Sequence, residues 1–404
     1  MLALAAHAQQ TREQMPVVGS DGSITFQFAC PEADEVNIVG LGDDDIEMTQ
    51  RDGVWTCHLD SLPSEMYAYR YCTGRDRYCT DPLNPCTVRD ITDTLSYFIL
   101  PGYPGSYYIE QQVPHGKVEQ LWYDSSFDSD MPQRRLSVYL PPSYEADQSV
   151  RFPVLYLLHG TGGDEMAWLD MGRLAQIMDN MIAKGRCKPM IVVMPNGLAD
   201  MDAAPGASRY LHTEASHSNI ASWMGRTEKA FAREVMPFIE GRFRTQADKG
   251  HRAIAGLSMG GLHTMAISAN NPQAFDYVGL FSPQTMNALT DGNIKRIQRV
   301  TDRIGKIKSI LPNRLKQKYD EGREAVADVD IYQNLDDKLA AQFATAPKLY
   351  YIAIGKKDPL KTMLTAFRNR LSKLGCTYMY KETEGAHQWE NWRKYLIDFL
   401  PRIF

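Results

Sequence analysis

Short apolar runs separated by turn residues fill the first hundred residues of the chain. Between residues 19 and 100, β-prone segments such as SITFQFAC, VWTCHL and MYAYRYC alternate with clusters of Gly, Asp and Pro. Runs of this length bounded by turn signals predict strands, and their succession without helical segments predicts a small all-β sandwich. The sequence PGYPG begins at residue 101, so we expect a linker over 101–114.

The pattern changes in residues 115–404. After two strands of an opening hairpin come PVLYLLHG, PMIVVMPNG, HRAIAGLS, YVGLFS and KLYYIAIG, which are apolar throughout, as strands covered on both faces should be. Helix-favouring stretches at 171–184, 227–242 and 260–270 lie between these runs. This alternation predicts an α/β domain built on a parallel sheet.

A charged, helix-favouring stretch at 285–345 interrupts the alternation. We expect it to be a helical insertion. It is interpreted either as an ordinary pair of amphipathic surface helices or as a lid that shapes the substrate pocket.

Composition narrows the class of protein. The 404 residues are 44% hydrophobic and 23% charged, as in ordinary globular proteins. The net charge is −5 and no Lys/Arg-rich run occurs, so a nucleic-acid partner is not expected. No apolar run approaches the roughly 18 residues of a membrane-spanning helix, so no membrane span is expected.

The first 18 residues resemble the remnant of an export signal. Ala6-His7-Ala8 has the small-residue pattern of a cleavage site, although the basic region and most of the apolar region are missing. This interpretation predicts a secreted or periplasmic protein; the alternative is a native N-terminal tail.

The seven cysteines suggest neither a disulfide framework nor a metal site. Their number is odd, their spacing is irregular, and no Cys/His set has zinc-site spacing. We therefore expect mostly free thiols, no metal and no cofactor.

A candidate nucleophile lies in Gly256-Leu257-Ser258-Met259-Gly260. This G-x-S-x-G match follows the apolar run 253–255 and precedes a predicted helix, which is the context of a nucleophile elbow. The alternative is a Gly-rich helix start with Ser258 as its cap.

A serine nucleophile needs a base, and the base needs an orienting acid. In this fold type the order is Ser, acid, His, which leaves His263 and His387 of the nine histidines. His263 follows the nucleophile by about one helical turn with no carboxylate between, so we expect a structural role. His387 lies in a Gly-containing loop after a predicted strand, and is the expected base.

Asp358 is the expected acid, because it follows the apolar run 348–355 and so would stand at the carboxyl end of a strand. Four competitors in or beside the insertion rank lower: Asp328, Asp330, Asp336 and Asp337.

Two backbone N–H groups should form the oxyanion hole. One is expected from Met259, the residue after the nucleophile, and the other from the loop His159-Gly160-Thr161-Gly162-Gly163, with Thr161 preferred and Gly160 as the alternative. That loop lacks the sequence of a phosphate-binding P-loop or a dinucleotide fold.

Five blocks in this order, HGTGGDEMAW, VVMPNG, GLSMGG, GKKDPL and EGAHQWENW, resemble the feruloyl-esterase and esterase-D-like carbohydrate esterases of the α/β-hydrolase type. The resemblance extends to enterobactin-type siderophore esterases and mycolyltransferases. In the N-terminal part, FACPEADEVNIVG, Trp55, Tyr69-Arg70-Tyr71 and DPLN at 81–84 resemble the immunoglobulin-like modules of glycogen-branching enzymes and two-domain esterases. Such modules either bind glycans or only pack on the enzyme.

The resemblance implies hydrolysis of an ester on an acylated plant cell-wall polysaccharide or oligosaccharide, with release of ferulate from feruloylated xylan oligosaccharides as the favoured reaction. Acetyl xylan esterase and siderophore esterase are alternative activities, and a catalytically idle carbohydrate-binding protein is a third. Trp168, Trp223 and Trp389 are either pocket or core residues. The acyl group, the glycan and the oligomeric state are not specified by the sequence.

Overall fold

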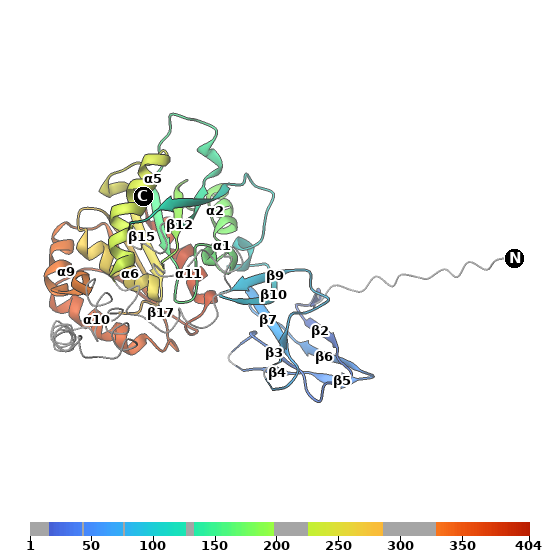
Figure 1. The fold of residues 1–404 in the computed structure, drawn as a ribbon. Coiled ribbons are helices and arrows are strands. Elements are labelled where there is room, and N and C mark those ends of the chain that lie inside the picture. The colour runs from blue at the N-terminus through green and yellow to red at the C-terminus, as the bar shows by residue number, and fades with distance from the viewer. Residues whose placement is uncertain (1–15, 43, 76, 127–132, 198–224, 286–328) are drawn as a thin grey trace, which may run out of the picture. The chain divides into compact units, whose positions relative to one another are not determined.

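The computed structural model describes residues 16–42, 44–75, 77–126, 133–197, 225–285 and 329–404. The chain divides into two compact units, Met1–Ile109 and Glu110–Phe404. Figure 1 shows the strands of the first unit in blue and those of the second from green to red.

The N-terminal unit contains two antiparallel sheets. The first has the order β1 (Val17–Val18), β2 (Ile24–Ala29), β6 (Val54–Leu59), β5 (Thr49–Arg51). The second has the order β4 (Ile46–Glu47), β3 (Asn37–Val39), β7 (Met66–Cys72), β10 (Asp93–Ile99), β9 (Thr87–Asp90), with β8 (Tyr78–Cys79) paired to β7.

Alternate side chains of the two sheets form one shared core. Phe26 and Phe28 of β2 are buried on one face of their strand. Their rings contact Tyr69 and Tyr71 of β7, with ring centroids 5.2 and 4.5 Å apart. The period-two pattern of the sequence therefore packs sheet against sheet, as half-buried strands do.

The edges of this unit differ from the sequence-based boundaries. Val17 and Val18, placed in the tail by the sequence, pair with β2; residues 1–15, which carry the suspected export signal, lie outside the described residues. The expected linker 101–114 is divided, because its first part packs into the N-terminal unit through the short 3-10 helix η1 (Gly105–Tyr107). The Gly105 N–H donates to Ser64 Oγ at 3.0 Å, and Tyr108 is fully buried.

The C-terminal unit is built on one eight-stranded sheet. Its order is β11 (Lys117–Asp124), β12 (Gln133–Leu140), β14 (Ile191–Pro195), β13 (Val154–Leu158), β15 (Arg252–Leu257), β16 (Tyr277–Phe281), β17 (Leu349–Gly355), β18 (Met379–Thr383). The first two pairings are antiparallel and the rest are parallel. Strands β13 to β16 are almost entirely buried, which explains their uninterrupted apolar sequences.

Helices lie on both faces of this sheet (Figure 1). The α-helices are α1 (Ala167–Asp170), α2 (Leu174–Ala183), α4 (Arg226–Ala230), α5 (Met236–Arg242), α6 (Met259–Asn270), α9 (Leu335–Ala344), α10 (Lys361–Lys373) and α11 (Trp389–Phe399). A π-helical turn, η3 (Phe231–Val235), joins α4 to α5, and 3-10 turns are η2 (Pro142–Tyr144), η4 (Lys249–His251), η7 (Val329–Tyr332) and η8 (Leu400–Arg402). Among these described helices, none is long and apolar enough to cross a membrane.

Core contacts assign the helices to the two faces. Trp168 of α1 and Phe399 of α11 both contact the Phe281 ring of β16. Helices α6, α9 and α10 contribute Met265, Leu339 and Phe367 to the core cluster on the opposite face. Most of the expected insertion, 286–328, lies outside the described residues; its described end contains η7 and α9.

The position of β13 beside β15 creates the place for a site. The chain leaves β13 toward α1 on one face and leaves β15 toward α6 on the other. In open α/β sheets, ligands bind where neighbouring strands diverge in this way, at their carboxyl ends. Ser258 follows β15 at this point, and His159 follows β13.

Candidate active site

Ser258 occupies a sharp turn between β15 and α6. Its φ of 52° and ψ of −115° are strained for a residue with a side chain. The turn is possible because its neighbours are glycines: a Cβ on Gly256 would lie 2.3 Å from the Gly260 carbonyl oxygen, and one on Gly260 would lie 2.5 Å from the Leu158 and His159 carbonyl oxygens. The glycines thus permit the turn that places Ser258 beyond the end of the sheet.

The three residues expected to form a triad lie in one hydrogen-bonded chain. Ser258 Oγ lies 2.9 Å from His387 Nε2, and His387 Nδ1 lies 2.9 Å from Asp358 Oδ2. They follow β15, β18 and β17, respectively, so three carboxyl ends of the same parallel sheet supply them. This geometry fits a neutral imidazole whose Nδ1–H donates to the carboxylate and whose Nε2 accepts from the serine hydroxyl.

Asp358 is held as a carboxylate. Its exposed fraction is 4%, and Oδ1 accepts a second hydrogen bond from the Leu360 N–H at 2.9 Å. Burial alone raises the pKa of Asp358, but the hydrogen bonds from His387 and Leu360 outweigh it, so the pKa lies below its usual value. An ionised carboxylate at this place stabilises a protonated imidazole.

The loop that carries His387 is fixed by contacts that the sequence did not predict. The Lys357 N–H donates to the Gly385 carbonyl at 3.0 Å, which joins the acid loop to the histidine loop. Asn391 Nδ2 donates to the Ala386 carbonyl at 2.8 Å. The Trp392 ring meets the imidazole edge-on, with centroids 5.0 Å apart. In the sequence, Asn391 and Trp392 follow His387 by about one helical turn, and this spacing could have indicated that they contact the histidine loop.

The expected oxyanion loop lies against the nucleophile turn. A Cβ on Gly160 would lie 3.3 Å from Ser258 Cβ and 2.5 Å from a Leu257 methyl carbon. Thr161, the next residue, is exposed. Met259 is the first residue of α6, where N–H groups have no intrahelical acceptor. Both expected donors therefore belong to segments that adjoin Ser258.

The other candidates lie elsewhere. His263 is fully buried, with Nδ1 2.8 Å from Glu228 Oε1. Asp330 forms an ion pair with Lys229 at 2.7 Å and Asp336 forms one with Arg370. Asp337 is exposed, and Asp328 lies outside the described residues.

The three tryptophans have different positions. Trp168 is a core residue, 1% exposed, whose Nε1 donates to the Leu158 carbonyl. Trp389 is partly buried and contacts both Trp168 and Trp392. Trp223 lies outside the described residues.

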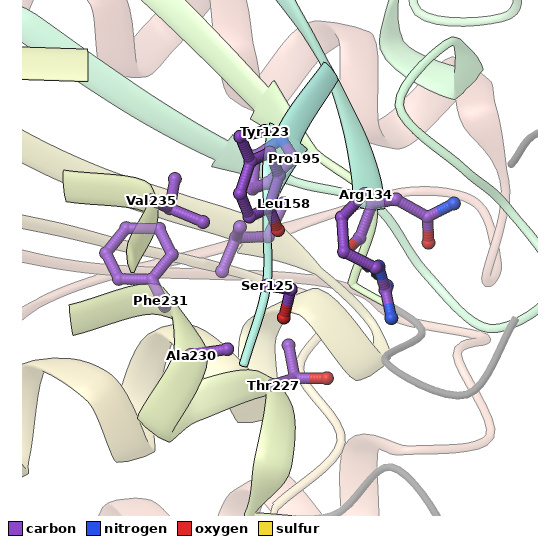
Figure 2. Close-up of a pocket in the computed structure, with 10 residues that line it drawn as sticks. Tyr123, Ser125, Arg134, Leu158, Pro195, Thr227, Ala230, Phe231 and Val235 are labelled. Atoms are coloured by element: carbon purple, nitrogen blue, oxygen red, sulfur yellow. Dashed lines mark hydrogen bonds between the residues drawn. The ribbon is translucent and has the colours of Figure 1, made fainter. Parts of the chain in front are cut away.

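A narrow pocket opens at the same edge of the sheet. Figure 2 shows Phe231 and Val235 on one side, Tyr123 beside Pro195 and Leu158 in the middle, and Arg134 on the opposite side. The lining residues are Tyr123, Ser125, Arg134, Leu158, Pro195, Asn196, Thr227, Ala230, Phe231 and Val235. Leu158 directly precedes the oxyanion loop. In the described part of the chain, no group of three or more His, Cys, Asp or Glu is placed to hold a metal ion.

Comparison with known proteins assigns a family. The Esterase family model matches residues 129–403. The endo-1,4-beta-xylanase/feruloyl esterase of Xylanibacter ruminicola is 32% identical over 292 residues, which are 68% of this chain and 37% of that protein. The acetyl esterase of Caldicellulosiruptor saccharolyticus is 27% identical over 251 residues, 62% of this chain and 82% of that protein. The chain spans only 37%, 13% and 38% of the first three curated relatives it matches.

Solved structures agree on the fold. The ferulic acid esterase of Anaeromyces mucronatus has a TM-score of 0.54 at 20% identity, over 74% of this chain and 95% of that one. The enterobactin esterase of Shigella flexneri has a TM-score of 0.60 at 15% identity, over 94% of this chain and 92% of that one. The chain therefore belongs to the esterase family of carboxylic ester hydrolases, with an α/β-hydrolase-type fold in its C-terminal unit.

Proposed function

We propose that this chain is a serine esterase that acts on acylated plant cell-wall polysaccharide and releases ferulate from feruloylated xylan oligosaccharides. The observation that carries the proposal is the chain of hydrogen bonds from Ser258 through His387 to Asp358, at 2.9 Å each, on a strained nucleophile turn. A buried carboxylate, an oriented imidazole and an outward serine together suit acyl transfer.

The residues act in two half-reactions. Ser258 Oγ attacks the ester carbonyl while its proton passes to His387 Nε2, and Asp358 stabilises the resulting imidazolium. The N–H groups of Met259 and Thr161 stabilise the tetrahedral oxyanion. His387 then protonates the departing sugar oxygen as its bond to the carbonyl carbon breaks, which leaves an acyl-enzyme on Ser258. Water, deprotonated by His387, attacks that ester, and His387 returns the proton to Ser258 Oγ as the acid leaves.

The choice of substrate rests on resemblance. The sequence blocks resemble feruloyl esterases, and the 32% identical relative is named as a xylanase/feruloyl esterase. Two other activities have support of the same kind: the acetyl esterase among the relatives favours acetylated xylan, and the enterobactin esterase structure, matched over 94% of this chain, favours a siderophore trilactone.

A parallel assay separates these activities. Purified protein is given methyl ferulate, p-nitrophenyl acetate, acetylated xylan and a catechol trilactone, with the Ser258→Ala variant as the blank. Preferential turnover of methyl ferulate supports the proposal. Activity confined to acetyl esters or to the trilactone retains the mechanism and replaces the substrate. No turnover of any ester refutes the proposal and favours an idle, carbohydrate-binding protein.

For the N-terminal unit, we propose an immunoglobulin-like accessory module. Its two facing antiparallel sheets with an aromatic core support this assignment. Tyr78 and Tyr103 are exposed aromatic residues on this unit, and exposed rings suit stacking on sugars. Affinity electrophoresis in xylan-containing gels tests glycan binding: retardation that Tyr78→Ala and Tyr103→Ala abolish supports it, and unretarded migration leaves packing as the role.

A further inference from the structure

His159 begins the oxyanion loop, and its buried imidazole is tied at both nitrogens. Nδ1 lies 2.8 Å from the Gly160 carbonyl oxygen, and Nε2 accepts a hydrogen bond from the Gly197 N–H at 2.8 Å. Because Nε2 is an acceptor, the hydrogen of the neutral ring is on Nδ1 and donates to Gly160. Burial lowers the pKa of His159 to about 4, so the ring is neutral near pH 7.

The bond to the Gly160 carbonyl orients the peptide that carries the Thr161 N–H. In a trans peptide, C=O and the following N–H point in opposite directions. The Gly160 oxygen is turned toward the imidazole and also accepts from the Gly163 N–H at 3.1 Å. The Thr161 N–H therefore points away from His159. Gly160 packs on Ser258 and Thr161 is exposed, so the peptide that carries this N–H lies beside the nucleophile turn.

The other end of this arrangement is anchored near the helix that begins with Met259. The Gly197 carbonyl accepts from Thr227 Oγ1 at 2.7 Å. The next residue, Glu228, is fully buried and lies 2.8 Å from His263 Nδ1 of α6. Polar contacts thus lead from the oxyanion loop, through the end of β14 and α4, to the helix that supplies the second expected donor.

We propose that His159 is a positioning residue for ester hydrolysis: by donating to the Gly160 carbonyl while held by Gly197, it aims the Thr161 N–H at the oxyanion. This inference rests on the proposed function, because it presupposes an oxyanion at Ser258. His159 does not touch the substrate in this scheme. Its contribution is to fix a donor before the reaction, and a preorganised donor stabilises only the charge that develops in the transition state.

Two substitutions test the two hydrogen bonds of the His159 imidazole separately. In His159→Asn, the side-chain NH₂ takes approximately the place of Nδ1 and retains a donor to Gly160. In His159→Gln, the longer amide reaches toward Gly197 and no donor remains at the Nδ1 position. Tyr139→Phe is a matched control, because it deletes a buried side-chain hydrogen bond to Asp179, 2.6 Å long, on β12.

The measurements are kcat and KM with p-nitrophenyl acetate, and the affinity for a trifluoromethyl ketone, which forms a tetrahedral adduct with the serine. Loss of a complete oxyanion donor lowers kcat about 10²- to 10³-fold, so a misdirected donor in His159→Gln should lower it by about 10- to 100-fold. We expect KM to stay within about twofold and ketone affinity to fall in proportion to kcat. His159→Asn should retain most of the activity, and Tyr139→Phe should leave all three quantities unchanged.

A loss in His159→Gln no greater than that in Tyr139→Phe, or a change in KM alone, would overturn the proposal. NMR of ¹⁵N-histidine-labelled wild-type protein gives a readout that needs no turnover and no variant: His159 should be the Nδ1–H tautomer at pH 7, and an Nε2–H tautomer contradicts the inference. If the wild-type protein hydrolyses no ester but has the Nδ1–H tautomer, the proposed function is wrong, whereas the hydrogen bond from His159 to the Gly160 carbonyl is confirmed. If it is active but has the Nε2–H tautomer, only the positioning role of His159 is wrong.

Discussion

Replacement of Asp358 by asparagine should invert the hydrogen bonding of His387. Oδ1 of Asp358 accepts from the Leu360 N–H at 2.9 Å, and Oδ2 faces His387 Nδ1 at 2.9 Å. In Asp358→Asn the amide oxygen must stay opposite the Leu360 N–H, because an NH₂ there would oppose a donor. The NH₂ then faces Nδ1 and makes that nitrogen an acceptor. The ring hydrogen moves to Nε2, which can no longer accept the proton of Ser258.

The expected loss follows from this wrong tautomer. In a serine protease, the same exchange lowers kcat about 10⁴-fold, equivalent to about 5 kcal/mol of transition-state stabilisation. Asp358 is 4% exposed, so water does not replace the lost carboxylate. We expect a fall of about 10³- to 10⁴-fold in kcat for p-nitrophenyl acetate at pH 7, with little change in KM. This loss is smaller than that of Ser258→Ala, because the nucleophile and the oxyanion donors remain.

The control for this experiment is Asp398→Asn. Asp398, on α11, also has a pKa below its usual value, because hydrogen bonds from Arg402, Lys381 and Tyr351 outweigh its burial. Its replacement should lower the free energy of unfolding without lowering kcat. A folded Asp358→Asn enzyme with kcat within tenfold of the wild-type value would refute the assignment of the acid and would direct the search to Asp330 or Asp336.

Three further results are expected. Ser258→Ala and His387→Ala should each lower kcat by about 10⁵- to 10⁶-fold. The double variant should lose no more activity than either single variant, since triad members act as a unit. If the two losses add in the free energy of activation, Ser258 and His387 do not act in the same step. Ser258→Gly should be more stable in urea than Ser258→Ala by about 1 kcal/mol, because the positive φ strains any residue with a Cβ; equal midpoints would show that the turn is relaxed. In the unfolded chain, the His159 imidazole takes up a proton below about pH 6.5. In the folded protein, where Asp164, His263 and Arg134 are the charged or titratable groups near it, burial lowers its pKa to about 4. The unfolded state therefore binds more protons between these values, and the free energy of unfolding should fall by about 3 kcal/mol as the pH drops from 7 to 4; a His159→Asn variant with the same pH slope would disprove this contribution.

The sequence predicted those parts of the structure that depend on local patterns. Uninterrupted apolar runs placed the parallel strands, and G-x-S-x-G between a strand and a helix placed Ser258 at the turn. Asp358 and His387 could be selected because each lies in the loop after a strand, and carboxyl ends of parallel strands share one edge. The structure brings these three residues into hydrogen-bond distance.

The remaining features depend on contacts between distant segments, which a single sequence does not encode in a readable form. The HGTGG motif predicts a donor at Thr161, but it does not reveal the hydrogen bond between His159 and Gly197, because Gly197 follows a different strand. The division of the chain after Ile109 lies within the expected linker, but the sequence did not show that residues 101–105 form a turn packed on Ser64. The pattern of apolar and polar residues does not show which distant segments such loops and turns contact.

Ser258 and His387 are 129 positions apart in the chain, and His387 and Asp358 are 29 apart. Between β15, which leads to Ser258, and β18, which leads to His387, the sheet must add β16 and β17. Contacts of such sequence separation slow folding, because the entropy of closing a long loop is lost before the contacts contribute. We therefore expect ester hydrolysis to recover more slowly during refolding than the circular-dichroism signal of the helices, because activity requires the edge strand β18 to dock.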